Sequence, residues 1–148
     1  MPKNARYPLT PEEISIPGYK LYMKTGRKED RGIAIYVSES VSAWQVEMTT
    51  IVDEALWIRM RGDKNKEILK GCVYRSPQST KENNATLRNV LVEANSSKEA
   101  YVLMVGDLNY PKINWHTQST RGSMETKQYK FIEAFRDFYM YHPVYHPV

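Results

Sequence analysis

The sequence predicts a mixed α/β fold, and three observations support this class. The first half of the chain contains apolar runs that alternate with polar residues or end in turn residues, as β-strands do. The second half contains two segments whose apolar residues recur at helical spacing. A short apolar run separates these two segments, so strands and helices alternate there. We therefore expect a mixed sheet with helices packed on it.

Strands are expected throughout the first half, after an irregular, proline-containing lead-in over residues 1–18. Charged or glycine-containing turns separate two pairs of the apolar runs, which predicts two hairpins. The expected strands are 19–24, 32–37, a segment from Ala43, 54–61 and 66–75.

The second half is expected to contain a helix, a buried strand and a second helix. Ser79 followed by Glu82 has the spacing of a capping box, and the apolar residues from Leu87 to Ala94 recur at helical positions. The run 101–105 predicts a strand that is covered on both faces. A long polar loop over 111–122 precedes the second helix. The expected apolar face of that helix comprises Phe131, Ile132, Phe135, Phe138 and Tyr139.

Size and composition favour one domain, over residues 19–141, followed by a proline-containing tail at 142–148. The 148 residues include 21 Lys and Arg against 17 Asp and Glu, a net charge of +4 that tolerates DNA as a partner without requiring it. The single cysteine, Cys72, excludes an internal disulfide and is expected in the core. Because no segment is apolar enough to span a membrane, we expect an intracellular protein of the nucleus or cytoplasm, without a disulfide-linked partner.

Polar side chains follow two of the expected buried strands. Asp107 and Asn109 come directly after the strand 101–105, and residues two apart in an extended chain point to the same side. Tyr74 and Arg75 end the other strand, and both can donate hydrogen bonds to phosphate oxygens. A crossover through one helix could bring the two strand ends to the same edge of the sheet, where α/β proteins bind ligands. Taken singly, each pair also fits ordinary turn or surface residues.

In combination, these motifs resemble the endonuclease/exonuclease/phosphatase superfamily, and most closely the apurinic-type endonuclease domain of non-LTR retrotransposon reverse transcriptases. The similar segments come in the family's order from about Arg31 to Tyr141, and "GDLNYPKINW" after "YRSP" is specific to the retroelement branch. The segments that carry the resemblance are "DRGIAIYV", "ALWIRM", "ILKGCVYRSP", "VLMVGDLNYPKINW" and "QYKFIEAFRDFYMY".

The resemblance implies a DNase I-like fold, in which two packed β-sheets are flanked by helices, and magnesium-dependent hydrolysis of DNA phosphodiesters. It assigns Asp107 to orienting or deprotonating the attacking water, and Asn109 and Tyr74 to contacts with the scissile phosphate. Arg75 is expected to contribute to binding phosphate or DNA. These residue types suit the chemistry, because a water nucleophile needs an acceptor and a charged phosphoryl transition state needs donors and a cation.

The chain also departs from this family. The family's metal-binding glutamate lies upstream of a segment similar to Pro2 to Glu13 of this chain, so it has no counterpart here. The family's closing Ser-Asp-His motif and its reverse transcriptase domain have no counterpart either. We therefore expect a remnant truncated at both ends, with exposed sheet edges and little or no activity, and we assign no metal ligand. One alternative is a non-catalytic DNA-binding or structural remnant. Another is a phosphodiesterase of the same superfamily that acts on phosphoinositides or sphingolipids.

Overall fold

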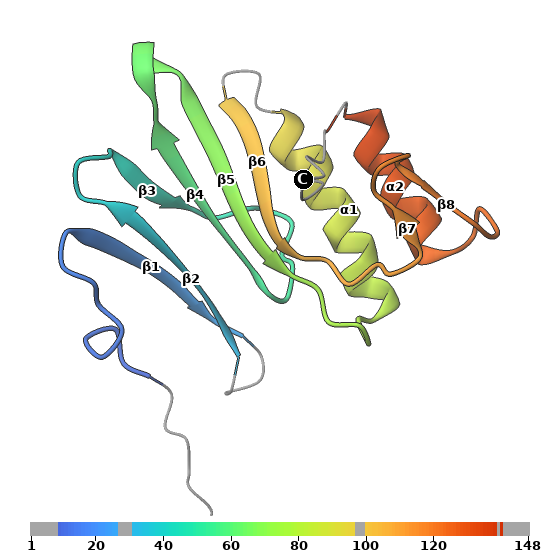
Figure 1. Ribbon diagram of the computed structural model, residues 1–148, viewed down its shortest axis with the longest axis horizontal. Helices are drawn as coiled ribbons and strands as arrows, with labels where there is room; N and C mark the ends of the chain where they lie inside the picture. The colour runs from blue at the N-terminus through green and yellow to red at the C-terminus, as the bar shows by residue number, and fades with distance from the viewer. Residues whose placement is uncertain (1–8, 27–30, 97–99, 139, 141–148) are drawn as a thin grey trace, which may run out of the picture. The chain divides into compact units, whose positions relative to one another are not determined.

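The computed structural model describes residues 9–26, 31–96, 100–138 and 140, and its internal contacts divide the chain into two compact units (Figure 1). The single domain expected over 19–141 stays a prediction, and the tail 142–148 lies outside the described residues. Unit 1 comprises Met1–Glu47, Asp53–Tyr74 and Glu99–Asp107, and unit 2 comprises Met48–Val52, Arg75–Lys98 and Leu108–Val148.

Unit 1 is built from two sheets. The first is the antiparallel hairpin of β1 (Tyr19–Thr25) and β2 (Gly32–Ser38), which confirms the first expected hairpin. The second has the order β3-β4-β5-β6, in which β4 and β5 form the second expected hairpin around a short 3-10 helix, Asp63–Asn65. Because β5 and β6 pair in parallel, this is the mixed sheet that the sequence predicts. Its strands are β3 (Ala43–Val46), β4 (Ala55–Arg61), β5 (Glu67–Tyr74) and β6 (Ala100–Asp107). The expectation that the strand over 101–105 is covered on both faces is wrong, because β1 and β2 pack against β4 and β5 and leave Tyr101, Leu103 and Val105 exposed.

The core of unit 1 lies between these two sheets. Successive strand residues point to opposite faces, so Ile33, Ile35 and Val37 of β2 share one face, and they pack against Leu56 and Ile58 of β4. Cys72 of β5 is half-buried and packs against the same cluster. Burial raises the pKa of its thiol, although the charge of Lys70 acts in the opposite direction. Cys72 is therefore a packing residue, as expected, since a reactive thiol needs a lowered pKa.

The opposite face of the four-stranded sheet requires a glycine on β5. Gly71 is the register partner of Trp57 on β4, and a Cβ atom at Gly71 would collide with the indole ring. Trp57 is buried, so its ring fills the space that a side chain on β5 would otherwise occupy. The ring thereby covers the backbone of β5.

Unit 2 contains both helices, α1 (Lys81–Ser96) and α2 (Lys127–Asp137), which contact each other. Both confirm the helices expected from the apolar spacing. In the segment expected to be a polar loop, the structure instead has a two-stranded sheet of β7 (Ile113–Asn114) and β8 (Ser119–Thr120). These strands are only two residues long, too short for the alternation that identifies a strand in sequence.

The start of α1 also differs from the prediction. The hydroxyl Oγ1 of Thr80 accepts a hydrogen bond from the backbone N–H of Asn83, at 3.1 Å, which is the bond of an N-cap side chain. Ser79 instead accepts from the side-chain amide of Asn83 at 2.9 Å. The predicted capping box of Ser79 and Glu82 is therefore wrong, and the N-cap lies one residue later, at Thr80. Two adjacent residues with hydroxyl groups can each act as the N-cap, so the sequence alone does not distinguish them.

Aromatic side chains organise the packing around α2. Phe131 stacks on Tyr110 with ring centroids 4.7 Å apart, and Trp115 meets both Phe131 and Phe135 edge to face, at 6.4 and 5.8 Å. These are favourable ring geometries. Of the apolar face expected for α2, Phe131, Ile132 and Phe135 are buried, Phe138 caps the helix, and Tyr139 lies outside the described residues.

Glu93 of α1 links this helix to the segment Met48–Val52 and should make unit 2 sensitive to acid. Its carboxylate accepts hydrogen bonds from Thr49 N and Oγ1, both at 2.6 Å, and from Thr50 N at 2.8 Å. Burial raises the pKa of Glu93, but these bonds outweigh it and lower the pKa from 4.5 to about 2. A lowered folded-state pKa gives stability above the unfolded pKa that is lost as the carboxylate protonates.

We therefore expect the melting temperature of the wild type to fall as the pH drops from 4.5 towards 2. Glu93→Gln cannot ionise, so its melting temperature should be lower at neutral pH and should fall less over the same range. Thermal unfolding of both chains in steps of pH measures the difference. Parallel curves for the two chains would contradict the assignment.

Candidate active site

Tyr74 and Asp107, two of the expected site residues, are the last residues of adjacent parallel strands. They are register partners on β5 and β6, so their side chains leave the same face of the sheet next to each other. Asp107 is exposed and Tyr74 is half-buried. The backbone N–H of Tyr74 donates to the carbonyl of Glu54 at 2.9 Å, which fixes the end of β5. The crossover expected from the sequence therefore brings these two strand ends together.

Gly106 allows β6 to reach this position. Its φ of +140° lies in a region that other residues rarely adopt. A Cβ atom at Gly106 would collide with the backbone carbonyl of Val73, its register partner on β5. The residue before Asp107 must therefore be glycine for two independent reasons, backbone conformation and contact with the neighbouring strand.

Arg75 is a fully buried polar residue of unit 2, with 1% of its surface exposed. Its Nε donates to Oδ1 of Asn84 on α1 at 2.7 Å. Its Nη1 donates to the carbonyls of Leu108 and Asn109, at 3.3 and 2.8 Å. Arg75 therefore joins the start of α1 to the turn that follows β6.

Asn109 in turn donates a hydrogen bond to Arg75. Its side-chain Nδ2 donates to the backbone carbonyl of Arg75 at 2.8 Å, and its φ of 47° lies in the left-handed region that Asn tolerates better than most residues. The two residues thus exchange hydrogen bonds in both directions. The side chain of Asn109 is held in one orientation by the same residue that holds its backbone.

Tyr110 covers the guanidinium of Arg75. The Cζ atom of Arg75 lies 4.0 Å from the centroid of the Tyr110 ring, a cation–π distance. Burial raises the pKa of the Tyr110 hydroxyl, and the charge of Arg75 opposes this shift. Arg75 Nη2 and Tyr110 Oη are buried and have no hydrogen-bond partner among the described residues.

A second arginine, which sequence reasoning did not select, lies beside Tyr74. The Cζ atom of Arg31 is 5.5 Å from the centroid of the Tyr74 ring. Its Nη1 lies 3.9 Å from Oε1 of Glu54, and 34% of its side chain is exposed. Arg31 immediately precedes β2, whose packing on the sheet brings it to the end of β5. Unlike Arg75, it is a cation that a ligand can reach.

The structure therefore brings the expected site residues together in two pairs. Tyr74 pairs with Asp107 in unit 1, and Arg75 pairs with Asn109 in unit 2. The catalytic and phosphate-binding roles stay predictions, and the contacts of Arg75 indicate that it positions Asn109. Sequence reasoning missed Arg31, Glu54, Asn84 and Tyr110, whose contacts come from distant parts of the chain.

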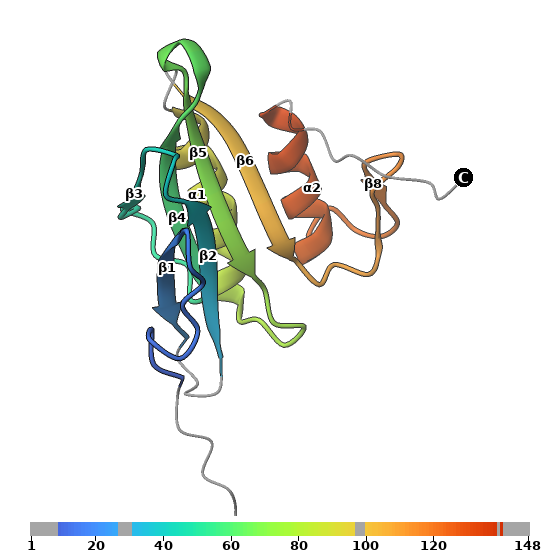
Figure 2. The same ribbon diagram turned by 60° about the vertical axis from the view of Figure 1, so that its left-hand side comes forward.

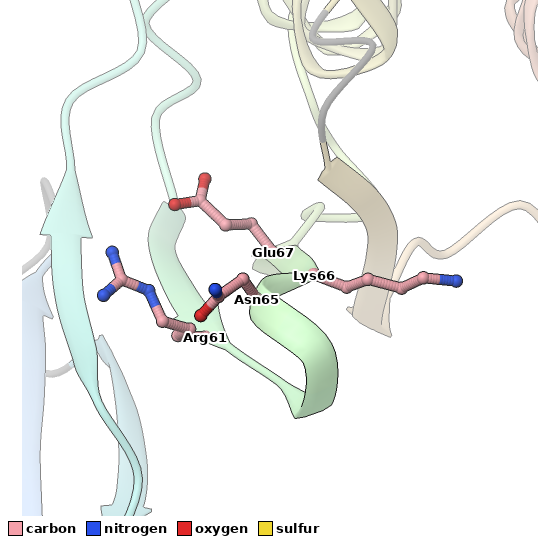
Figure 3. Close-up of a pocket in the computed structure, with 4 residues that line it drawn as sticks. All are labelled: Arg61, Asn65, Lys66 and Glu67. Atoms are coloured by element: carbon pink, nitrogen blue, oxygen red, sulfur yellow. The ribbon is translucent and has the colours of Figure 1, made fainter.

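A surface pocket lies at the other end of β5. It is lined by Arg61, Asn65, Lys66 and Glu67 around the β4–β5 turn and has a volume of about 570 Å³ (Figure 3). The side chain of Lys66 extends away from the other three in this view and donates to the Tyr101 hydroxyl at 3.0 Å. Because β5 runs from Glu67 to Tyr74, the pocket is separate from the candidate active site.

Comparisons with known proteins add no family assignment. No family model matches the chain, and no curated protein matches it. Within the described ranges, no group of three or more His, Cys, Asp or Glu side chains is close enough to hold a metal ion. In the same part of the chain, no helix is both long and apolar enough to cross a membrane.

Proposed function

We propose that the chain carries part of a DNase I-like phosphodiesterase site that hydrolyses DNA weakly, and that it derives from a retrotransposon endonuclease. One structural observation carries this proposal: the register pairing that places Tyr74 beside Asp107 at the ends of β5 and β6. The reaction itself, hydrolysis of DNA phosphodiesters, is inferred from the resemblance of the sequence to the endonuclease family. The packing of two sheets in unit 1 agrees with the expected sandwich.

Each residue has a distinct task in this proposal. The exposed carboxylate of Asp107 accepts a proton from water and directs an oxygen lone pair at phosphorus. The Tyr74 hydroxyl donates to a phosphate oxygen beside it, whereas the role of Asn109 in unit 2 rests on the resemblance alone. Arg31, stacked near the Tyr74 ring, supplies positive charge to the same phosphate. Arg75 keeps Asn109 in place.

The residues present are compatible with magnesium. Mg²⁺ is commonly held by one or two carboxylates together with substrate phosphates, and Asp107 offers one exposed carboxylate. When bound, the ion neutralises charge that develops on the phosphate. Glu54 is a poorer candidate, because only 11% of its side chain is exposed and Arg31 lies 3.9 Å away.

Nicking of supercoiled plasmid by the purified chain tests the proposal. We expect slow nicking in magnesium that EDTA abolishes and that Asp107→Ala reduces at least a hundredfold, since loss of a general base costs about this factor. Asp137→Ala is the matched control, because Asp137 is another exposed aspartate, at the end of α2, and should leave the rate unchanged. Circular dichroism establishes that each variant is folded.

Three outcomes separate the alternatives. Absence of nicking by the folded chain, with salt-sensitive DNA binding that survives Asp107→Ala, indicates a non-catalytic DNA-binding module. Release of phosphate from a phosphoinositide, or of a phosphorylated headgroup from a sphingolipid, without nicking supports the alternative that acts on lipids. Nicking that persists in Asp107→Ala contradicts the assigned site.

A further inference from the structure

The β1–β2 hairpin has a free edge that faces the β6 side of unit 1. The β1 strand lies towards β3 and β4, because the Tyr22 hydroxyl donates to the Ala43 carbonyl at 2.8 Å and β1 contacts β4. The β2 strand contacts β4 and β5. The edge of β2 that is not paired with β1 therefore points towards β6, and no strand among the described residues pairs with it.

The backbone groups on this edge can be identified. Gly26 N donates to Arg31 O at 2.8 Å, so this pair is hydrogen-bonded within the hairpin. Bonded and non-bonded pairs alternate along an antiparallel ladder. By this alternation and the register of the hairpin, Ala34 and Tyr36 direct their N–H and C=O groups away from β1. They form the part of β2 to which another strand could bond.

Exposed apolar side chains lie on β6, on the face of the sheet that β2 packs against. Cys72 faces the cluster under β2, and its register partner is Val105, so Val105, Leu103 and Tyr101 share that face. They are 39%, 48% and 60% exposed. In Figure 2, β2 lies in front of β4, and β5 and then β6 follow to its right. The β1–β2 sheet thus covers β4 and leaves β6 open.

A cation lies beside Leu103 on this face, and the carboxylate of Asp107 lies on the same face at the end of β6. Lys70, the register partner of Leu103, points to the same face and is half-buried. It forms no ion pair with an acidic residue in the described part of the chain. A half-buried lysine between the apolar residues Ile58 and Leu103 favours a carboxylate opposite its ammonium group.

We propose that this surface, formed by Ala34 and Tyr36 of β2 and by Tyr101, Leu103 and Val105 of β6, binds an extended peptide segment of another protein. The segment adds to the free edge of β2 as a strand, so that its alternate side chains cover β6. Those side chains are apolar, except for one acidic residue opposite Lys70. The free edge requires an extended backbone, the three exposed residues require an apolar face, and Lys70 requires the carboxylate.

A synthetic eight-residue peptide provides the probe, with threonine at even positions, glutamate at the third position and valine at the other odd positions. A control peptide has the same composition with its valines consecutive. We expect the first peptide to bind, as measured by fluorescence anisotropy, and to slow amide exchange at Ala34 and Tyr36, as measured by NMR. The control peptide should do neither.

Variants of the chain locate the binding surface. Leu103→Lys should weaken binding at least about tenfold, because burial of a leucine side chain favours association by at least that factor. Val92→Lys is the matched control, since Val92 of α1 is 50% exposed and lies outside the surface, and it should bind as the wild type does. Lys70→Glu should weaken binding about fivefold and should be rescued by a peptide with lysine in place of glutamate.

Four results would overturn the proposal. These are no slowing of exchange at Ala34 and Tyr36 at millimolar peptide, equal binding by the control peptide, unchanged affinity in Leu103→Lys, and a dimer in light scattering without peptide. If Leu103→Lys also abolishes this dimer, a second copy of the chain occupies the surface. None of these measurements depends on nicking, so they are independent of the proposed activity.

Discussion

Replacing Arg75 with methionine should lower the free energy of unfolding by about 3 kcal/mol. Methionine keeps most of the aliphatic stem but removes all three hydrogen bonds of the guanidinium, so Asn84 Oδ1 and the carbonyls of Leu108 and Asn109 lose their donor. A buried acceptor left without a partner, such as Asn84 Oδ1, costs about 1 to 3 kcal/mol, the two part-buried carbonyls cost less, and removal of a buried charge offsets part of this sum. Urea unfolding followed by circular dichroism measures the change.

Arg136→Met is the matched control for this experiment. Arg136 lies in α2, is 56% exposed, and its Nη1 is 3.5 Å from Glu133 Oε1. Exposed ion pairs contribute little, so this substitution should change stability by less than about 0.5 kcal/mol. Equal losses of unfolding free energy in Arg75→Met and Arg136→Met would contradict the stabilising role assigned to the buried contacts of Arg75.

Replacing Gly106 with alanine should have a still larger effect and should leave little folded chain at 25 °C. The new Cβ atom would collide with the carbonyl of Val73 and would force β6 away from β5, in addition to the strain of a φ of +140°. A clash with a backbone atom of a paired strand cannot be relieved by a side-chain rotation. We expect a loss of at least about 4 kcal/mol, in the range reserved for the most disruptive substitutions.

Gly18 provides the control that separates strain from collision. Its φ is also positive, at +82°, but a Cβ atom there would meet no atom within 4 Å. Gly18→Ala should therefore lower the free energy of unfolding by only about 1 kcal/mol, the cost of a positive φ for alanine. Comparable losses for the two alanine variants would indicate that backbone conformation alone explains the requirement at Gly106.

The secondary structure of both units could largely be predicted because its signals are local. Alternating apolar residues and turns define the hairpins, and the change to helical spacing after Ser79 defines α1. The parallel pairing of β5 with β6 followed from the rule that a crossover through one helix joins parallel strands. The short β7–β8 pair was not predicted, because strands of two residues are too short to show the alternation of apolar and polar residues.

The contacts of the candidate site could be predicted only in part. The register of β5 and β6 sets the pairing of Tyr74 with Asp107, and strand order alone suggested it. The burial of Arg75 depends on Asn84, on two backbone carbonyls and on the Tyr110 ring, none of which has a motif. Arg31 reaches Tyr74 only because two sheets stack, which no local pattern encodes.

The parallel β5–β6 pair also determines when the proposed site forms during folding. The hairpins β1–β2 and β4–β5 join strands close in sequence and can form within microseconds, whereas β5 and β6 pair only after the chain between them, which contains α1, has crossed back. Tyr74 and Asp107 therefore become neighbours late. Local opening of β6 in the native state should separate them while the hairpins persist, so the fraction of chains with an intact site can fall well before global unfolding begins.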